Sequence, residues 1–164
     1  MHPAAYDYVH ASVQRYKLRY LPMLEIGSRL INGTIRDLFT TTYGIDILPG
    51  AYVDTVACGS TYTPPTPPEV IVCCEVFEHT PLAEAICHNV FRILKPGGYF
   101  IVTAAGLARA PHSAFNGGGL RENEFYRNVS ATDLASWLSE FHILEIEVRG
   151  EDIRAVARKE PLDA

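Results

Sequence analysis

The chain has 164 residues, of which 48% are hydrophobic and 20% charged, a composition that excludes a wholly disordered protein. Its formal net charge of −5 disfavours DNA or RNA as a general partner. No apolar run reaches the roughly 18 residues of a membrane span, and the N-terminus lacks a signal peptide. The four cysteines form no C-x-x-C pair, so we expect free thiols in a cytoplasmic protein, and no metal.

The first third of the chain alternates short apolar runs with polar turns, and we expect a single domain over residues 1–164. Apolar residues at helical spacing predict an N-terminal helix within 1–20, and a second helix is expected at 35–39. Three apolar runs predict short strands. These runs cover residues 23–27, 43–47 and 52–57.

The middle of the chain continues this alternation. Residues 59–68 are rich in turn formers and predict a loop, and the apolar run 70–74 predicts a strand covered on both faces. Thr80 and Pro81 resemble the start of a helix, whose apolar stripe is expected to contain Leu82, Ile86 and Val90. That helix is expected to end at Lys95-Pro96-Gly97-Gly98, before a further strand at 99–103.

The last third begins with a long irregular stretch, residues 106–128. Such long loops are usually functional or mobile, and we expect this one to be a substrate loop. Ser130 then predicts a helix start, with Asp133 as an imperfect capping box. Alternating residues at 144–148 and 153–157, separated by a glycine, predict an antiparallel hairpin.

Strands separated by helices and closed by a hairpin predict a doubly wound α/β fold with a mainly parallel sheet. Ligands of such sheets bind at the carboxyl ends of the strands. Gly27 follows the first predicted strand, and Asp46 follows the second at close to the ~20-residue spacing at which an acid binds ribose hydroxyls. This pair predicts an adenosine-type cofactor, although a turn glycine and an ordinary strand-end aspartate would give the same pattern.

The turn after the first strand narrows the choice of cofactor. A dinucleotide site needs G-x-G-x-x-G, but Arg29 stands where the second glycine would be, which disfavours a nicotinamide oxidoreductase. No Gly-Lys-Ser/Thr occurs, so a Walker loop is also missing. A cofactor that has a ribose but no phosphate, such as S-adenosylmethionine, fits the turn better.

Five segments resemble, in order, successive motifs of class I S-adenosylmethionine-dependent methyltransferases. The segments are LEIGSR (24–29), GID (44–46), VDTVA (53–57), CEVFEH (74–79) and LKPGG (94–98). The resemblance implies a Rossmann-like methyltransferase fold and S-adenosylmethionine as cofactor. The match extends from about residue 22 to 105, and its last two motifs together are the most specific.

The resemblance also implies roles for individual residues. Glu25 and Gly27 would line the methionine portion of the cofactor, and Asp46 would bind the ribose hydroxyls. Ala57 and Cys58 would lie against the adenine. The rest of the implied site consists of Ser28, Ile47 and, near the sulfonium, Glu75.

The implied reaction is direct displacement of the cofactor's methyl group by a nucleophile of a small-molecule or protein acceptor. The candidate general bases are Glu75, His79 and His112, and His112 could instead contact the substrate from a lid together with Tyr126 and Arg127. Neither the acceptor nor the oligomeric state can be inferred from the sequence. Arg29 in the glycine turn keeps an alternative open, a methyltransferase-like binding module without turnover.

Overall fold

One seven-stranded mixed sheet forms the centre of the computed structural model, which describes residues 3–161. The strand order is β3-β2-β1-β4-β5-β7-β6. The pairs among β1 to β5 are parallel, whereas β7 runs antiparallel to both β5 and β6. The strands are β1 (Met23–Ile26), β2 (Thr42–Asp46), β3 (Thr55–Val56), β4 (Val70–Cys74), β5 (Tyr99–Ala105), β6 (His142–Arg149) and β7 (Asp152–Arg158). This arrangement confirms the predicted fold class.

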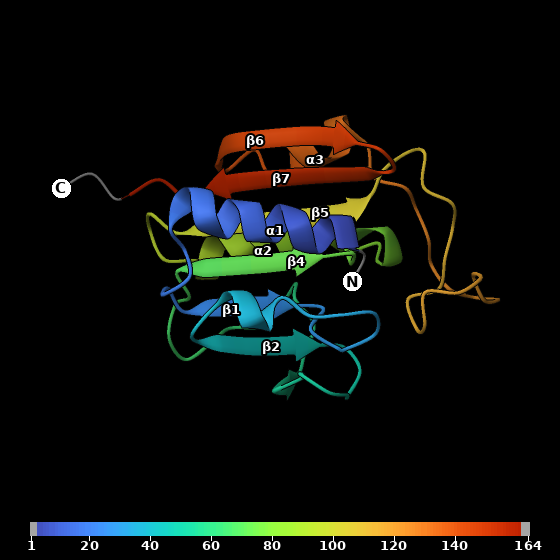
Figure 1. Cartoon of the computed structure of the whole chain (residues 1–164), viewed down its shortest axis with the longest axis horizontal. Coiled ribbons are helices and arrows are strands. Elements are labelled where there is room, and N and C mark those ends of the chain that lie inside the picture. Colours follow the sequence, from blue (N-terminus) through green and yellow to red (C-terminus); the bar gives the residue numbers. More distant parts are fainter. Residues whose placement is uncertain (1–2, 162–164) are drawn as a thin grey trace.

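Helices cover both faces of the sheet, with α1 (Pro3–Tyr16) in front of it and α2 (Ala83–Ile93) behind it in Figure 1. The short helix α3 (Ala131–Trp137) packs on the α2 side. Alternate residues of β4 enter the two cores: Ile71 joins the core under α2, and Val72 joins the core under α1. Because strand side chains alternate between faces, one apolar strand can serve both layers.

Two predicted helices are shorter than expected. The N-terminal helix ends at Tyr16, because Lys17 adopts a left-handed backbone with φ of 58° and the Leu18 amide donates to the carbonyl of Val13 at 2.9 Å. The segment 35–39 forms only the 3₁₀ turn η1 (Arg36–Leu38). Five residues form too few hydrogen bonds to offset the cost of nucleating an α-helix.

Two further boundaries differ from the sequence prediction. The strand expected at 52–57 is reduced to β3, because Tyr52 has a left-handed φ of 67° that extended chain does not allow. Helix α2 starts at Ala83, and the Thr80 hydroxyl accepts from the Leu82 amide at 3.1 Å, in a turn that precedes the helix. Leu82 is therefore 43% exposed and does not join the predicted apolar stripe.

The last third of the chain follows the prediction closely. Residues 106–128 contain neither helix nor strand, and they extend past the carboxyl ends of β4 and β5 in Figure 1. Ser130 and Asp133 form a complete capping box at the start of α3, and β6 and β7 form the expected hairpin. Among residues 3–161, no helix combines the length and the apolar character that a membrane span requires.

Candidate functional site

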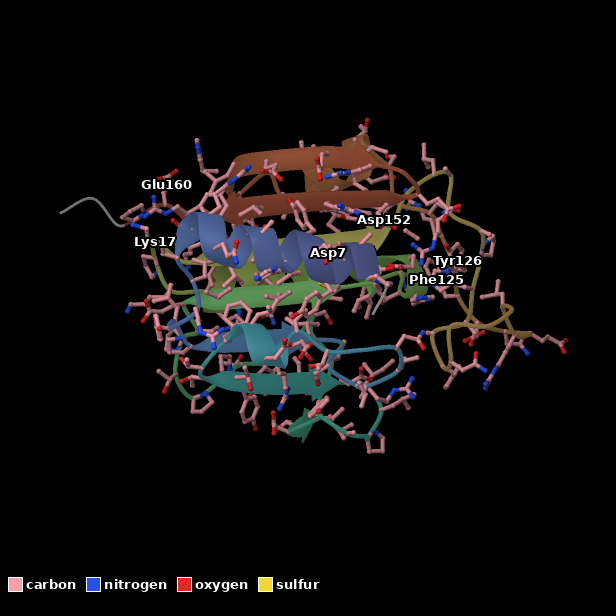
Figure 2. All side chains as sticks on the ribbon, in the orientation of Figure 1. Asp7, Lys17, Phe125, Tyr126, Asp152 and Glu160 are labelled. Atoms are coloured by element: carbon pink, nitrogen blue, oxygen red, sulfur yellow. The ribbon has the colours of Figure 1, made fainter. Side chains whose placement is uncertain are left out.

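A cavity of about 890 Å³ lies at the carboxyl ends of the parallel strands, between two walls. The strand wall comes from the ends of β1 to β3, and the loop wall from the end of β4, the 3₁₀ turn η2 (Phe77–His79) and the loop 106–128. We define the strand wall by Glu25, Gly27, Asp46, Ala57 and Cys58. We define the loop wall by Glu75, His79, Arg109 and His112, with the fully buried Glu78 behind them. In Figure 2, Phe125 and Tyr126 mark the loop at this end of the sheet.

Gly27 forms the floor of the strand wall, where β1 turns into the following loop. Its φ is +80°, and a Cβ atom at this position would lie 2.3 Å from Cγ2 of Val76. Only glycine meets both conditions without strain. The amides of Gly27 and Ser28 both donate to the Ile45 carbonyl, at 2.9 and 3.1 Å, which ties the turn to β2.

Asp46 ends β2 with its carboxylate at the cavity, half-buried. One oxygen accepts from the Leu48 amide at 2.9 Å and the other from the Arg29 amide at 3.3 Å. These two backbone donors hold the carboxylate in one orientation. Each carboxylate oxygen has two lone pairs, so Asp46 retains capacity for further donors from a ligand.

Glu25 is 5% exposed, and its nearest cation is Arg36, whose Nε lies 3.7 Å from Oε2. Burial raises the pKa of Glu25 to about 7, although the Arg36 guanidinium acts in the opposite direction. Arg36 also donates to the Asp54 carboxylate at 2.6 Å, and Asp54 accepts from the Gly44 amide at 2.7 Å. This chain of contacts fixes Glu25 behind the ends of β1 and β2.

The remaining cofactor candidates divide between the cavity and its surroundings. Ala57, Cys58 and the 68%-exposed Ile47 line the cavity. Ser28 is buried and does not line the cavity. Its hydroxyl lies next to the position that a Cβ atom of Gly44 would occupy. Its side chain therefore lies on the far side of the turn from the cavity.

The three candidate bases meet on the loop wall. Glu75, with a left-handed φ of 57°, accepts a hydrogen bond from the Thr103 hydroxyl at 3.0 Å. The rings of His79 and His112 pack edge to face at 4.8 Å, and Tyr126 lies against both, at 5.6 and 5.3 Å. Burial and the neighbouring His112 lower the pKa of His79 to about 4, so that its imidazole is neutral at physiological pH.

A family model described as "Methyltransferase domain" matches residues 6–142 of the chain. The chain belongs to this methyltransferase family. A search of curated proteins finds no significant match to the methyltransferase.

Solved structures of methyltransferases share the fold. A structure of an S-adenosylmethionine-dependent methyltransferase from Methanosarcina mazei superposes with a TM-score of 0.70 at 15% identity, covering 98% of this chain and 99% of that one. A Burkholderia thailandensis 1,6-didemethyltoxoflavin-N1-methyltransferase with bound S-adenosylhomocysteine gives 0.72 at 14% identity, covering 96% and 79%. A methyltransferase from Clostridium acetobutylicum gives 0.69 at 14%, covering 94% and 90%.

Two charged residues of this methyltransferase's site, Arg36 and Arg109, were not among the residues selected from the sequence, whereas Glu78 lies in the range 75–79 that was selected after the fourth strand. Arg36 neighbours Glu25, and Arg109 lies 3.8 Å from Glu75 while donating to Asp152 at 2.7 Å. Glu78 belongs to the CEVFEH segment, but its complete burial has no sequence signal. Arg36 and Arg109 lie in turns without a motif, so their spacing indicates no role for them.

Proposed function

We propose that the chain is an S-adenosylmethionine-dependent methyltransferase that acts on a small-molecule or protein acceptor. The observation that carries this proposal is the placement of Asp46 beside Gly27 at the end of a parallel sheet, on the wall of a cavity of about 890 Å³. The proposal is supported by the family assignment and by solved neighbours with bound S-adenosylmethionine or S-adenosylhomocysteine.

The strand wall has the donor and acceptor pattern that this cofactor requires. Asp46 is held by two backbone amides and keeps lone pairs for a ribose diol. Gly27 is required at this turn, because any side chain there would collide with Val76. Ala57 and Cys58 offer a small, largely apolar surface to the adenine, and Glu25 lies near the methionine end.

The bound cofactor supplies an activated methyl group, which an acceptor nucleophile displaces in line. The chain contributes alignment of the two reactants within a cavity that the loop 106–128 partly closes. His79 is neutral, because its pKa is about 4, but the same low pKa makes its ring nitrogen a weaker base for the proton of an acceptor hydroxyl than an ordinary histidine would be. Glu75, oriented by Thr103, and His112 are the other two groups on the loop wall that can accept such a proton.

The acceptor site is proposed to comprise the loop 106–128 and the N-terminal helix, as parts of one methyltransferase domain. Both Pro3 of α1 and residues from Arg109 to Phe125 border the cavity. The loop contributes polar residues to the lining, among them Ser113, Asn123 and Glu124. Tyr126 is not in the lining, and its hydroxyl donates to the Ala110 carbonyl at 3.3 Å. Burial raises the pKa of Tyr126 to about 12, so this hydroxyl stays protonated as a donor.

Substitution of Asp46 tests the cofactor site directly. Asp46→Ala should weaken S-adenosylhomocysteine binding by about 2–3 kcal/mol, roughly 30- to 160-fold, because the lost hydrogen bonds involve a charged acceptor. Isothermal titration calorimetry with S-adenosylmethionine, S-adenosylhomocysteine and NAD measures this change and compares the cofactors. Glu84→Ala, which removes an exposed carboxylate on α2, serves as the matched control.

The outcomes separate the competing functions. An unchanged dissociation constant for Asp46→Ala would show that Asp46 does not bind the cofactor. A heat of binding with NAD, and none with S-adenosylmethionine or S-adenosylhomocysteine, would indicate an oxidoreductase instead of a methyltransferase. Binding of S-adenosylmethionine without methyl transfer to any acceptor favours a binding module. Arg29 supports that last alternative, since its guanidinium donates to the Ala114 carbonyl at 3.1 Å within the cavity lining.

A further inference from the structure

A cluster of possible metal ligands lies on the loop wall, at the edge of the cavity. Glu78 and His79 come from η2, and His112 comes from the loop 106–128, more than thirty residues later in the chain. One ligand atom from each of these three residues lies within 4.8 Å of the other two. The fold therefore converges a carboxylate and two imidazoles on one point.

Glu78 carries the strongest indication that something is bound there. Its side chain is 0% exposed, and neither carboxylate oxygen has a hydrogen-bond partner. Glu75 adds a second buried carboxylate oxygen without a partner. A buried carboxylate is costly unless it is paired with a cation, coordinated to a metal or protonated.

The surrounding side chains do not balance a negative charge on Glu78, and burial together with the nearby Glu75 raises the pKa of Glu78 well above its usual range, so that it holds a proton when no cation is bound. The cation nearest to Glu75 is Arg109, whose guanidinium lies 3.8 Å from Oε2. Arg109 is itself paired with Asp152 at 2.7 Å and lies 4.0 Å from Glu151. Its single charge is thus shared among several carboxylates, and Glu78 is left without a direct ion-pair partner apart from His112, at 3.9 Å, when that ring is protonated.

His112 is oriented as metal-ligating histidines usually are, by a hydrogen bond from its other ring nitrogen. Nδ1 of His112 lies 3.2 Å from the Ala110 carbonyl, which selects the tautomer with a proton on Nδ1 and leaves a lone pair on Nε2. That Nε2 atom lies 3.9 Å from Oε1 of Glu78. His79 has a buried Nδ1 without a hydrogen-bond partner. Both rings therefore have a nitrogen available for coordination.

We propose that Glu78, His79 and His112 bind a divalent transition-metal ion. Ligand atoms about 2.0–2.2 Å from an ion lie roughly 3–4 Å from one another, so small side-chain rotations from the observed spacing suffice. Mixed imidazole and carboxylate donors favour Zn²⁺, Mn²⁺ or Fe²⁺ over Ca²⁺ and Mg²⁺, which prefer oxygen ligands alone.

Such an ion would adjoin the acceptor side of the cavity, because His79 and His112 both line it. A coordination position left open there would bind an oxygen or nitrogen of an incoming molecule and lower the pKa of that group. The ion would not use the strand-wall residues proposed to bind the cofactor, but it would occupy ring nitrogens of His79 and His112 and leave Glu75 as the remaining candidate base. Because the two sets of binding residues differ, cofactor binding and metal binding can fail separately.

The test uses the untagged full chain, stripped with a chelator and dialysed, in the absence of S-adenosylmethionine. Titration with Co²⁺ should produce visible ligand-field absorption that saturates at a single ion per chain, and calorimetry with Zn²⁺ should give the same stoichiometry. Glu78→Gln and His112→Asn should each weaken Zn²⁺ binding by at least about tenfold, as loss of a ligand or its support does elsewhere. His88→Asn, an exposed histidine paired with Glu140 on the surface, should bind as the wild type does.

Far-ultraviolet circular dichroism and thermal unfolding verify that each variant is folded. Failure of the wild type to bind either ion, or equal Zn²⁺ affinities for the wild type and a folded Glu78→Gln, overturns the proposal. Metal binding by a protein that does not bind S-adenosylhomocysteine would support the metal site and refute the proposed function. Binding of S-adenosylhomocysteine by a protein that does not bind metal would support the proposed function and refute the metal site.

Discussion

The strand wall and the loop wall enclose the same cavity, but their charged groups are satisfied in different ways. On the strand wall, Asp46 accepts two backbone hydrogen bonds, and Glu25 faces a guanidinium 3.7 Å away. On the loop wall, Glu78 is completely buried and has no hydrogen-bond partner. Both walls hold a buried carboxylate oxygen without a hydrogen-bond partner, but Glu25 has a guanidinium beside it, whereas Glu78 requires a bound cation or a proton.

The two walls also differ in what holds them in place. The strand wall is part of a hydrogen-bonded parallel sheet, whose register fixes the ends of β1 and β2. The loop wall is outside the sheet's hydrogen-bond ladder and is held by scattered contacts. The Arg127 amide donates to the Glu78 carbonyl at 2.8 Å. The Asn128 side-chain amide donates to the carbonyls of Gly106 and Arg109, at 2.6 and 2.9 Å. We therefore expect the strand wall to tolerate substitution less well than the loop 106–128.

The largest loss of stability is expected for Gly27→Ala on the strand wall. The left-handed φ costs an alanine about 1–2 kcal/mol, and the contact with Val76 adds about 1–3 kcal/mol of overpacking. We expect the free energy of unfolding to fall by about 3 kcal/mol, measured by urea denaturation. Gly119→Ala is the control, because no atom lies within 4 Å of its Cβ position, and equal losses for the two variants would contradict the rigid strand wall.

A pH-dependent loss of similar size is expected from Glu25. Its pKa rises from an ordinary value of 4.5 to about 7 in the fold, so the folded chain holds this proton more tightly than the unfolded chain. The stability that Glu25 contributes is thus fully present below about pH 4.5 and is lost as the pH rises through 7, on the order of 3 kcal/mol in total.

Comparison with Glu25→Gln isolates this effect, because the amide does not titrate. Between about pH 4.5 and about pH 7.5, we expect the unfolding free energy of the wild type to fall relative to that of Glu25→Gln. Glu84→Gln, with an exposed side chain, should follow the wild-type curve. Parallel curves for wild type and Glu25→Gln would show that Arg36 fully compensates the burial of Glu25.

The smallest loss is expected for Gly117→Ala on the loop. Its φ of +72° resembles that of Gly27, but its Cβ would meet Nδ2 of Asn32 at 2.5 Å, which is the end of a side chain that can rotate away. Only the backbone cost of about 1–2 kcal/mol should remain, so the same urea measurement should give a smaller loss than Gly27→Ala. A loss equal to that of Gly27→Ala would show that the two walls are equally rigid.

Most of the fold could be predicted from local patterns. Some elements are encoded by only a few neighbouring residues. Examples are the apolar run of β4, the alternation in β6 and β7 and the Ser130–Asp133 cap of α3. The prediction was wrong where a tertiary or backbone constraint overrode the pattern, as at Tyr52, whose left-handed φ shortens β3, and at Leu82, which remains exposed. Such constraints have no periodicity in the sequence.

Within the site, the sequence alone determined the residues that follow each strand, because every parallel strand ends at the same edge of the sheet. Gly27 and Asp46 could be selected in this way, and both border the cavity. Only the tertiary structure decided that Glu78 is buried without a partner and that His112 reaches it from an irregular loop. The reason is that burial and charge pairing depend on which distant segments pack together. Neither residue spacing nor local propensity encodes that packing.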